Sequence, residues 1–340
     1  ACMGLHSTRL RRGLVVLQVA FSVILLIGSG LLIRSLVQLS TVELGFDPAH
    51  LLTGQVKIQA ADYSTPEERN RFFTSVLEEI ETLPGVVSVT MINKLPILDP
   101  WQNWGVRPAD QPPPSGPGGF SAMARWVSPR YFETMSIPLL EGRDISAMDT
   151  PDAPPVMVVS ESVSRTLFPG QDAMGRKVAI GSWVFELIGV VGDARVNTLR
   201  GEPDPTMYMA SAQMRATSMR IAVRSSGDPN LLVGPIQQIL RQKDADVLYA
   251  EPVTMTSIID NALEEYRIVI LSLSIFAVVA LVLTAIGLYA VLAYHVSQHT
   301  NEIGIRLAMG ASNATLLNMI LKKGMVLVGL GLLLGVAGAY

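Results

Sequence analysis

Two histidines stand at the spacing that metal sites on helices use. His295 and His299 are four residues apart, which places two ring nitrogens on one face of a helix, as in zinc sites. The glutamate of a His-Glu-x-x-His motif, which would act as general base, is missing between them. The other histidines, His6 and His50, have no ligand-type neighbours in the sequence. We therefore interpret the pair as a polar collar beside an apolar segment, with metal binding as the alternative.

Residues 170–177 (GQDAMGRK) resemble a phosphate-binding P-loop at first sight. The lysine comes one position late, and no serine or threonine follows it to hold magnesium. This pattern predicts a turn that enters a strand at Val178. No nucleophile paired with a base and no metal cluster stands out elsewhere. The sequence thus predicts a chain that is not an enzyme and binds no cofactor, so that any ATP would be bound by a partner subunit.

Three apolar blocks dominate the chain, whose mean hydropathy is +0.37 with only 16% charged residues. Residues 14–33 and 268–293 contain no charge and reach the roughly 20 residues needed to cross a bilayer as a helix. Residues 324–340 form the third block, which predicts a spanning helix truncated by the end of the sequence, with a buried hydrophobic tail as the alternative. The composition therefore predicts an integral membrane protein.

A cleaved signal peptide is the alternative for the first block, which follows the basic residues Arg9, Arg11 and Arg12. Its apolar run exceeds the usual 7–15 or so residues of a signal sequence, and it is followed by Arg34 rather than by a small-residue cleavage site. We therefore predict an uncleaved membrane anchor.

The basic flanks of the spans predict the orientation of the chain. The residues before the first span and those between the second and third blocks are basic, as expected of cytoplasmic segments. Residues 35–267 must then lie outside the cytoplasm. They contain 19 Lys and Arg against 28 Asp and Glu, a net charge of −9, whereas the rest of the chain contains 7 and 1, a net charge of +6. This acidic balance argues against nucleic acid as a partner.

The outer domain begins and ends with similar predicted pieces. Strand-like residues 51–59 precede a helix that Thr65 and Glu68 begin as a capping box, with Pro66 in its first turn. The helix carries an apolar stripe: Phe72, Phe73, Val76, Leu77, Ile80 and Leu83. Strand 86–92 follows. The same order returns as strand 219–224, a helix from Asp228-Pro229 and strand 247–250, which together predict a split β-α-β sheet of ferredoxin-like type.

Between these pieces lies a β-rich insert, residues 93–215. Residues 96–120 contain seven prolines and four glycines and predict a loop or hinge. Short strands are predicted at 123–127, 156–160, 183–191 and 206–209, with a helix at 161–167. The only cysteine, Cys2, allows no internal disulfide, so a core must hold the domain together.

The predicted fold class is therefore a membrane protein with α-helical transmembrane segments and a large extracytoplasmic α+β domain. Its predicted domains follow in chain order: a cytoplasmic segment (1–12), transmembrane helix 1 (13–34), the extracytoplasmic domain (35–267, with an α+β part at about 49–92 and 216–252 and the insert at 93–215), transmembrane helix 2 (268–293), a cytoplasmic coupling segment (294–323) and transmembrane helix 3 (324–340).

A pair of glycines predicts helix packing in the third span. Gly331 and Gly335 have the small-xxx-small spacing that lets another helix approach closely. The spacing indicates that this helix packs, without indicating against what.

The most specific stretch is residues 302–311, EIGIRLAMGA. Without further information it predicts an amphipathic helix at the membrane surface. It also matches a Glu-Ile-Gly-Ile-Arg-x-Ala-x-Gly-Ala signature, and the chain resembles permeases of the FtsX-like and MacB-like ABC transporter family, in which this signature joins the second and third spans. Residues 11–16, 30–36 and 45–48 are similar to the start of the second half of a duplicated permease of this kind. The family unit has four spans, whereas this chain stops within the third.

The resemblance implies a permease subunit of an ABC-type export or extraction system in the bacterial inner membrane. Its implied partners are a cytoplasmic ABC ATPase, a second permease copy or fused half, membrane lipid and a periplasmic adaptor. Glu302, Gly304, Arg306 and Gly310 would couple the ATPase to movements of the outer domain. The alternative function is a transmembrane relay that controls an outer enzyme or sensor without transport. The substrate is not predicted.

Overall fold

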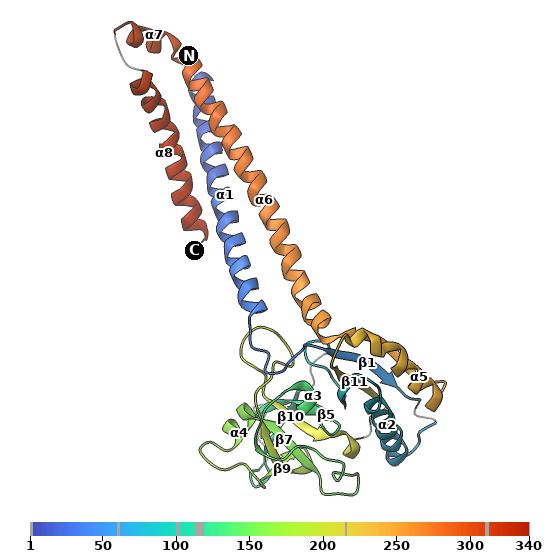
Figure 1. Cartoon of the computed structure of the whole chain (residues 1–340). Coiled ribbons are helices and arrows are strands. Elements are labelled where there is room, and N and C mark those ends of the chain that lie inside the picture. Colours follow the sequence, from blue (N-terminus) through green and yellow to red (C-terminus); the bar gives the residue numbers. More distant parts are fainter. Residues whose placement is uncertain are drawn as a thin grey trace. The chain divides into compact units, whose positions relative to one another are not determined.

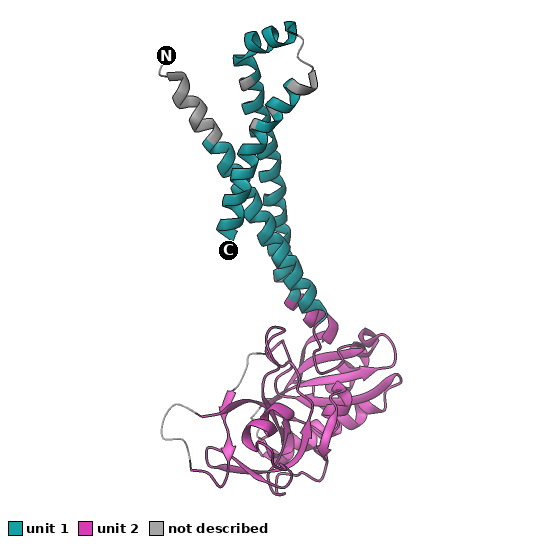
Figure 2. Ribbon diagram, turned by 90° about the vertical axis from the view of Figure 1, so that its left-hand side faces the viewer, with its two compact units in different colours: residues 1–41, 263–340 teal, residues 42–262 magenta. Residues whose placement is uncertain are grey.

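The computed structural model describes residues 3–59, 62–99, 103–112, 119–214, 216–309 and 313–339. The chain forms two compact units, coloured separately in Figure 2. Residues 1–41 and 263–340 make up the first, here named the helical unit, and residues 42–262 make up the second, here named the outer domain.

The described part of the helical unit consists of helices. These are α1 (Met3–Ser40), α6 (Met255–Gln298), whose first residues belong to the outer domain, α7 (Thr300–Ala308) and α8 (Asn313–Ala339). Three segments of these helices are long and apolar enough to cross a membrane: Gly13–Ser40, Met255–Gln298 and Leu316–Ala339. They contain the three apolar blocks of the sequence. Helices suit this role because they satisfy every backbone polar group within the segment.

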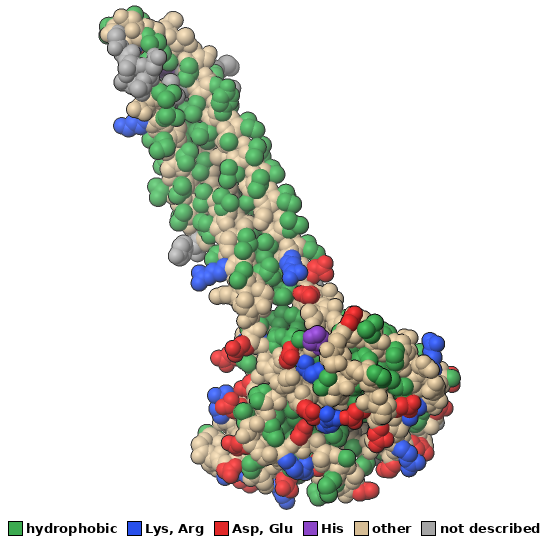
Figure 3. All heavy atoms as spheres, in the orientation of Figure 1, with side chains coloured by type: hydrophobic (Ala, Val, Ile, Leu, Met, Phe, Trp, Pro, Cys, Tyr) green, Lys and Arg blue, Asp and Glu red, His purple; other side chains and the backbone are tan. Residues whose placement is uncertain are grey.

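Hydrophobic side chains cover most of the visible face of the helical unit, whereas charged side chains gather over the outer domain (Figure 3). Within the span of α6, Leu271, Phe276 and Val278 are each more than 60% exposed. Exposure of such side chains over a whole helix surface indicates a surface made for lipid or for other apolar helices.

The outer domain contains a four-stranded antiparallel sheet in the order β12-β1-β11-β2. Figure 1 labels two of its strands, β1 and β11. The four strands are β1 (Leu51–Lys57), β2 (Val86–Ile92), β11 (Ser218–Ser225) and β12 (Leu248–Thr254), with α2 (Pro66–Glu81) after β1 and α5 (Val233–Lys243) after β11. Numbered by their place among these four, the strands lie in the order 4-1-3-2. The predicted split β-α-β sheet of ferredoxin-like type is confirmed.

Helix α2 begins as the sequence predicts. The Thr65 hydroxyl accepts a hydrogen bond from the Glu68 backbone N–H at 3.2 Å, and the Thr65 N–H donates to the Glu68 carboxylate at 3.1 Å. Phe72, Val76 and Ile80 are buried. They share one core cluster with apolar residues of α5, so these two helices cover the same face of the four-stranded sheet.

The insert lies between β2 and β11 and extends the same sheet. Its elements are β3 (Asn103–Gly105), β4 (Arg107–Pro108), β5 (Ser121–Val127), α3 (Tyr131–Met135), β6 (Leu139–Gly142), β7 (Val156–Ser160), α4 (Glu161–Leu167), β8 (Lys177–Ile180), β9 (Trp183–Val191), β10 (Thr206–Ala210) and the 3₁₀ turn η1 (Ser211–Gln213). β5 meets β2 at the pair Ile92–Val127. The pairs β5–β10 and β7–β9 are parallel, so the whole sheet is mixed.

One local prediction was wrong. Residues 96–120 are more than a loop or hinge, because they contain the short strands β3 and β4, which pair with β5 and β8. Among the described strands β4 pairs only with β8, so Pro108 lies at an edge of the sheet, where a missing backbone N–H is tolerated. The predicted helical start at Asp228 is confirmed: Asp228 caps the 3₁₀ turn η2 (Pro229–Leu232), and α5 follows directly at Val233.

Candidate functional site

The predicted coupling residues Glu302 and Arg306 lie one turn apart on α7. An Arg306 Nη2 atom lies 2.8 Å from a Glu302 Oε1 atom, so the two side chains form an ion pair. The other guanidinium nitrogen, Nη1, lies 3.1 Å from the Met319 sulfur on α8. Both charged side chains are about half exposed, which leaves the pair accessible to a partner. Exposed pairs of this kind contribute only roughly 0.3–0.5 kcal/mol to helix stability.

Apolar side chains of α7 and its C-cap are exposed as well. Ile305 is 62% exposed, Leu307 46% and Met309 81%, and no residue of α7 is buried. An apolar surface beside a satisfied ion pair can dock onto a partner without burying an unpaired charge.

The structure describes one of the two predicted coupling glycines, Gly304. Gly304 is exposed, and a Cβ added to it would meet no atom within 4 Å, so nothing in the described chain packs against this position. Gly310 lies outside the described residues. The coupling roles of all four residues stay predictions.

Gly331 and Gly335 lie against α1. A Cβ on Gly331 would lie 2.5 Å from the Val19 Cβ and 2.9 Å from the Val16 carbonyl oxygen. A Cβ on Gly335 would lie 2.7 Å from the Val23 Cβ and 2.8 Å from the Ala20 carbonyl oxygen. Both separations are far below van der Waals contact.

This face of α8 therefore has no room for a side chain against the backbone of α1. The glycines on α8 and the charged pair on α7 occupy different places in the helical unit and do not form one site.

A polar contact between α1 and α6 was missed in the sequence. The hydroxyls of Ser22 and Thr284 lie 3.0 Å apart. One turn away, a Cβ on Gly287 would lie 2.6 Å from the Gln18 Oε1 atom, so Gly287 makes room for the Gln18 side chain. Polar side chains in apolar helices commonly hydrogen-bond across helix interfaces. The signal was present as isolated Gln, Ser and Thr residues within uncharged spans.

The other motifs have ordinary structural roles in the described residues. The segment resembling a P-loop is a turn in which Gly170 and Gly175 have φ of +69° and +70°, and it leads into β8. Left-handed backbone of this kind favours glycine. His299 occupies the N-cap position of α7. Within the described ranges, no group of three or more His, Cys, Asp or Glu side chains is arranged to hold a metal ion.

Comparisons with known proteins match both parts of the chain. A family model described as the MacB-like periplasmic core domain matches residues 13–239, and a model described as the FtsX-like permease C-terminal matches residues 274–340.

Two curated relatives illustrate the match. "Probable export ATP-binding/permease protein MacB" of Pseudomonas entomophila is 28% identical over 222 residues, which cover 63% of this chain and 33% of that protein. "Macrolide export ATP-binding/permease protein MacB" of Aggregatibacter actinomycetemcomitans is 25% identical over 232 residues, covering 64% and 34%. The chain thus spans about a third of the length of these relatives.

Among solved structures, the periplasmic region of MacB from Actinobacillus actinomycetemcomitans aligns with a TM-score of 0.42 at 18% identity, covering 64% of this chain and 94% of that one. The core-domain model alone matches more than half of the chain. The chain therefore belongs to the family of FtsX-like permeases with a MacB-like periplasmic core domain, which are multi-pass proteins of the bacterial inner membrane with an extracytoplasmic α+β domain.

Proposed function

We propose that this chain is the permease part of an ABC-type export system, in which a cytoplasmic ATPase drives movements of the outer domain. The observation that carries the proposal is the succession, in one chain, of a periplasmic core domain match and a permease C-terminal match. The curated relatives that share this region are named export ATP-binding/permease proteins.

Helix α7 is the proposed docking element for the ATPase. It lies between two candidate spans, in the segment that the basic flanks place in the cytoplasm. Its exposed Ile305, Leu307 and Met309 provide apolar contact area, and the ion pair of Glu302 and Arg306 provides orientation. The pair contributes little to stability, so its value would lie in contacting the partner.

The membrane-spanning segments are better suited to transmitting a displacement along a helix than to conducting ions. No charged residue occurs between Ile268 and Ala293, and intramembrane ionisable residues are what usually mark the path of an ion. Helix α6 is a continuous α-helix from Met255 to Gln298. A continuous helix transmits displacement along its axis better than an interrupted one.

The proposed assembly contains two permease units, as two copies or as a fused half, each served by an ATPase. The apolar exposed faces of α6 and α8 provide surface for a second unit and for lipid. A periplasmic adaptor is a further proposed partner of the outer domain.

The test is affinity purification of the full-length protein from its native membranes in mild detergent, with mass spectrometry of the proteins that accompany it. The decisive variant is the double substitution Glu302→Ala with Arg306→Ala. The matched control is Arg34→Ala, which removes an exposed charge near the C-terminal end of α1, away from α7 in the sequence. We expect an ABC ATPase with the wild type and the control, and its loss with the double variant.

Two results would contradict the proposal. Equal recovery of the ATPase with the double variant would remove the coupling role of α7. Recovery of an outer enzyme or receptor without any ATPase would replace export by a signal relay.

A further inference from the structure

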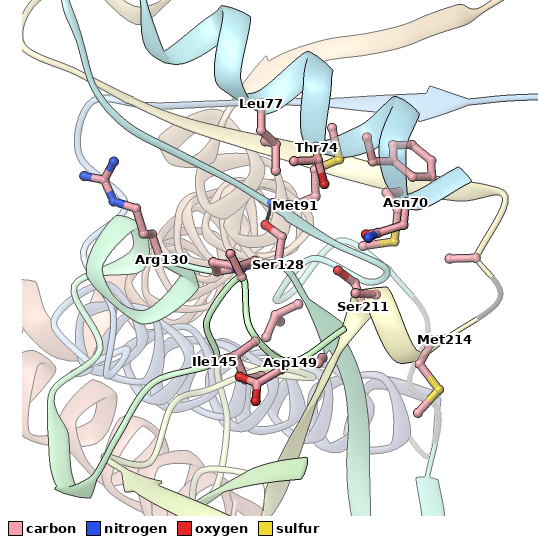
Figure 4. A pocket seen from close by; sticks show the side chains of 18 of the residues that line it. Asn70, Thr74, Leu77, Met91, Ser128, Arg130, Ile145, Asp149, Ser211 and Met214 are labelled. Carbon is pink, nitrogen blue, oxygen red and sulfur yellow. Dashed lines mark hydrogen bonds between the residues drawn. The ribbon is translucent and has the colours of Figure 1, made fainter. Parts of the chain in front are cut away.

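The outer domain contains a cavity of about 350 Å³ between α2 and the insert (Figure 4). Its lining comes from α2 and β2, from the segment between β5 and α3, from the loop at residues 145–149, and from η1 with the residues after it. The four-stranded part and the insert thus both build its walls. The cavity has more than ten times the roughly 30 Å³ that one water molecule occupies in the liquid, so it is no packing defect.

The interior of the cavity is mainly apolar and adaptable. Its apolar lining includes Phe73 and Leu77 of α2 and three methionines, Met91, Met214 and Met219. Figure 4 shows Leu77 projecting from α2 toward the space that Ile145 approaches from the opposite side. Unbranched methionine side chains adjust to differently shaped ligands at low cost, so this lining suits an apolar molecule.

Five charged side chains line the cavity: Arg69, Glu78, Glu81, Arg130 and Asp149. Glu78 is exposed, and Arg69 donates hydrogen bonds to the backbone carbonyl oxygens of Tyr63 and Ser64 at 2.8 and 3.3 Å. The other three are ion-paired within the protein. The Arg130 guanidinium donates two hydrogen bonds of 2.9 Å to Glu133 and also pairs with Glu81. The Asp149 carboxylate accepts hydrogen bonds of 2.9 and 2.8 Å from Arg143. A ligand charge would have to compete with these bidentate pairs, which are among the strongest polar contacts in proteins.

Neutral hydrogen-bonding groups remain. Asn70 and Thr74 of α2 and Ser211 of η1 line the cavity. Figure 4 shows these three polar side chains around one side of it. Together they offer an amide and two hydroxyls, which donate to and accept from uncharged polar groups.

We propose that this cavity binds an uncharged, largely apolar small molecule that carries a few hydroxyl, carbonyl or amine groups. The volume falls in the range of roughly 300–1,000 Å³ typical of small-molecule sites, and a few placed polar groups in an apolar lining are their usual composition. Because Glu81, Arg130 and Asp149 are ion-paired and Arg69 is hydrogen-bonded to backbone carbonyls, the lining favours an uncharged ligand. This inference concerns the outer domain alone and holds whether or not the proposed ATPase coupling is correct.

The test is protection of a cysteine placed in the cavity. The only cysteine, Cys2, is replaced by serine, and Ser211→Cys is introduced in the full chain in mild detergent. The rate at which a small methanethiosulfonate reagent modifies this thiol is measured with N-phenyl-1-naphthylamine, which is uncharged, and with 1-anilinonaphthalene-8-sulfonate, which has a similar ring system and a negative charge. The control thiol is Ser226→Cys, an exposed position of the outer domain that does not line the cavity.

The uncharged compound is added at about ten times its dissociation constant, so that the cavity is empty about a tenth of the time. We therefore expect it to slow modification of the cavity thiol about tenfold. The sulfonate and the control thiol should show less than a twofold effect. No protection by the uncharged compound, or equal protection by both compounds, would overturn the proposal.

A matched pair of substitutions on α2 tests whether the protecting compound binds in the cavity. Thr74→Trp places a large ring at the cavity, whereas Arg71→Trp places one at an exposed position of the same helix that does not line it. Protection should disappear with the first and persist with the second. Equal protection in both variants would show that the compound binds elsewhere and would overturn the assignment.

Discussion

Arg220 and Asp99 form a nearly buried, two-point ion pair between β11 and the beginning of the insert. The Nε and Nη2 atoms of Arg220 lie 2.8 and 3.2 Å from the two carboxylate oxygens of Asp99, and the side chains are 7% and 14% exposed. Asp99 also accepts a hydrogen bond from the Leu95 backbone N–H at 2.8 Å. The pair therefore ties the insert to the sheet on which it is built.

Removing one partner of this pair should destabilise the outer domain strongly. We expect Asp99→Ala to lower the free energy of unfolding by about 3–5 kcal/mol, because among the described residues it leaves the buried Arg220 guanidinium with the exposed Glu251 as its one carboxylate partner. Glu161→Ala, which removes one member of an exposed pair with Arg165, should cost less than about 1 kcal/mol. Thermal unfolding of the full chain in detergent measures the stability of both variants. A similar loss of stability in the two would show that the buried pair stabilises the domain no more than the exposed pair does.

Alanine in place of the glycines on α8 should disturb its packing on α1. Gly331→Ala or Gly335→Ala forces a Cβ against the backbone of α1, and overpacking of this kind costs about 1–3 kcal/mol. Gly329 is the matched control on the same helix, because a Cβ there meets no atom within 4 Å. Gly329→Ala should be neutral or slightly stabilising through helix propensity. The measurement is loss of helical structure on titration with a denaturing detergent, and equal midpoints for all three variants would contradict the packing role.

Exchanging the two charged residues of α7 distinguishes the effect of their ion pair from the effect of their contact with an ATPase. Glu302→Arg together with Arg306→Glu restores an ion pair one turn apart but reverses its direction. If the residues act by contacting an ATPase, the exchanged variant should lose association as fully as each single reversal, while its unfolding midpoint stays close to that of the wild type. Co-purification measures the association. Full recovery of association in the exchanged variant would show that only the pairing matters.

Asp144 should make the outer domain less stable as the pH rises. Burial raises the pKa of its carboxyl from 3.8 to about 6. The folded protein therefore keeps this proton at pH values where the unfolded chain has lost it, and stability falls between about pH 4 and pH 6. Asp149 acts in the opposite sense. Although burial raises its pKa, hydrogen bonds from Arg143 and Ser146 lower it overall, so its contribution is lost only on further acidification.

The substitution Asp144→Asn removes this titration and retains an oxygen that accepts the hydrogen bond from the Ile145 N–H, which measures 2.6 Å. We expect the variant and the wild type to unfold at similar temperatures near pH 4, and the variant to be the more stable one near pH 7. Unfolding temperatures at several pH values in that window provide the measurement. A difference that is the same at every pH would contradict the assignment.

The sequence by itself determined the elements whose cause is local. Uncharged apolar blocks long enough to span a bilayer predicted the helices, because hydrocarbon leaves the backbone no other way to satisfy its polar groups. Thr65 and Glu68 marked the start of α2 through contacts only three residues apart. Four strands of the insert and α4 were placed within about two residues, because alternating apolar runs ended at clear turn residues.

Tertiary structure decided everything that joins distant residues. Arg125 lies on a strand yet is completely buried, directly opposite Tyr208 in the β5–β10 pair, and no local rule places a guanidinium there. The strands β3 and β4 exist because their partners β5 and β8 supply the hydrogen bonds that a proline-rich segment lacks by itself. The glycine spacing on α8 predicted packing, but α1 as its partner follows only from the fold.

The cavity beside α2 is the clearest case of such long-range assembly. Thr74, Met91 and Ser211 have nothing in common along the chain, and they line one space only because the insert folds back beside the four-stranded sheet. A site assembled from segments more than a hundred residues apart leaves no spacing signature, since its geometry is produced by packing rather than by periodicity.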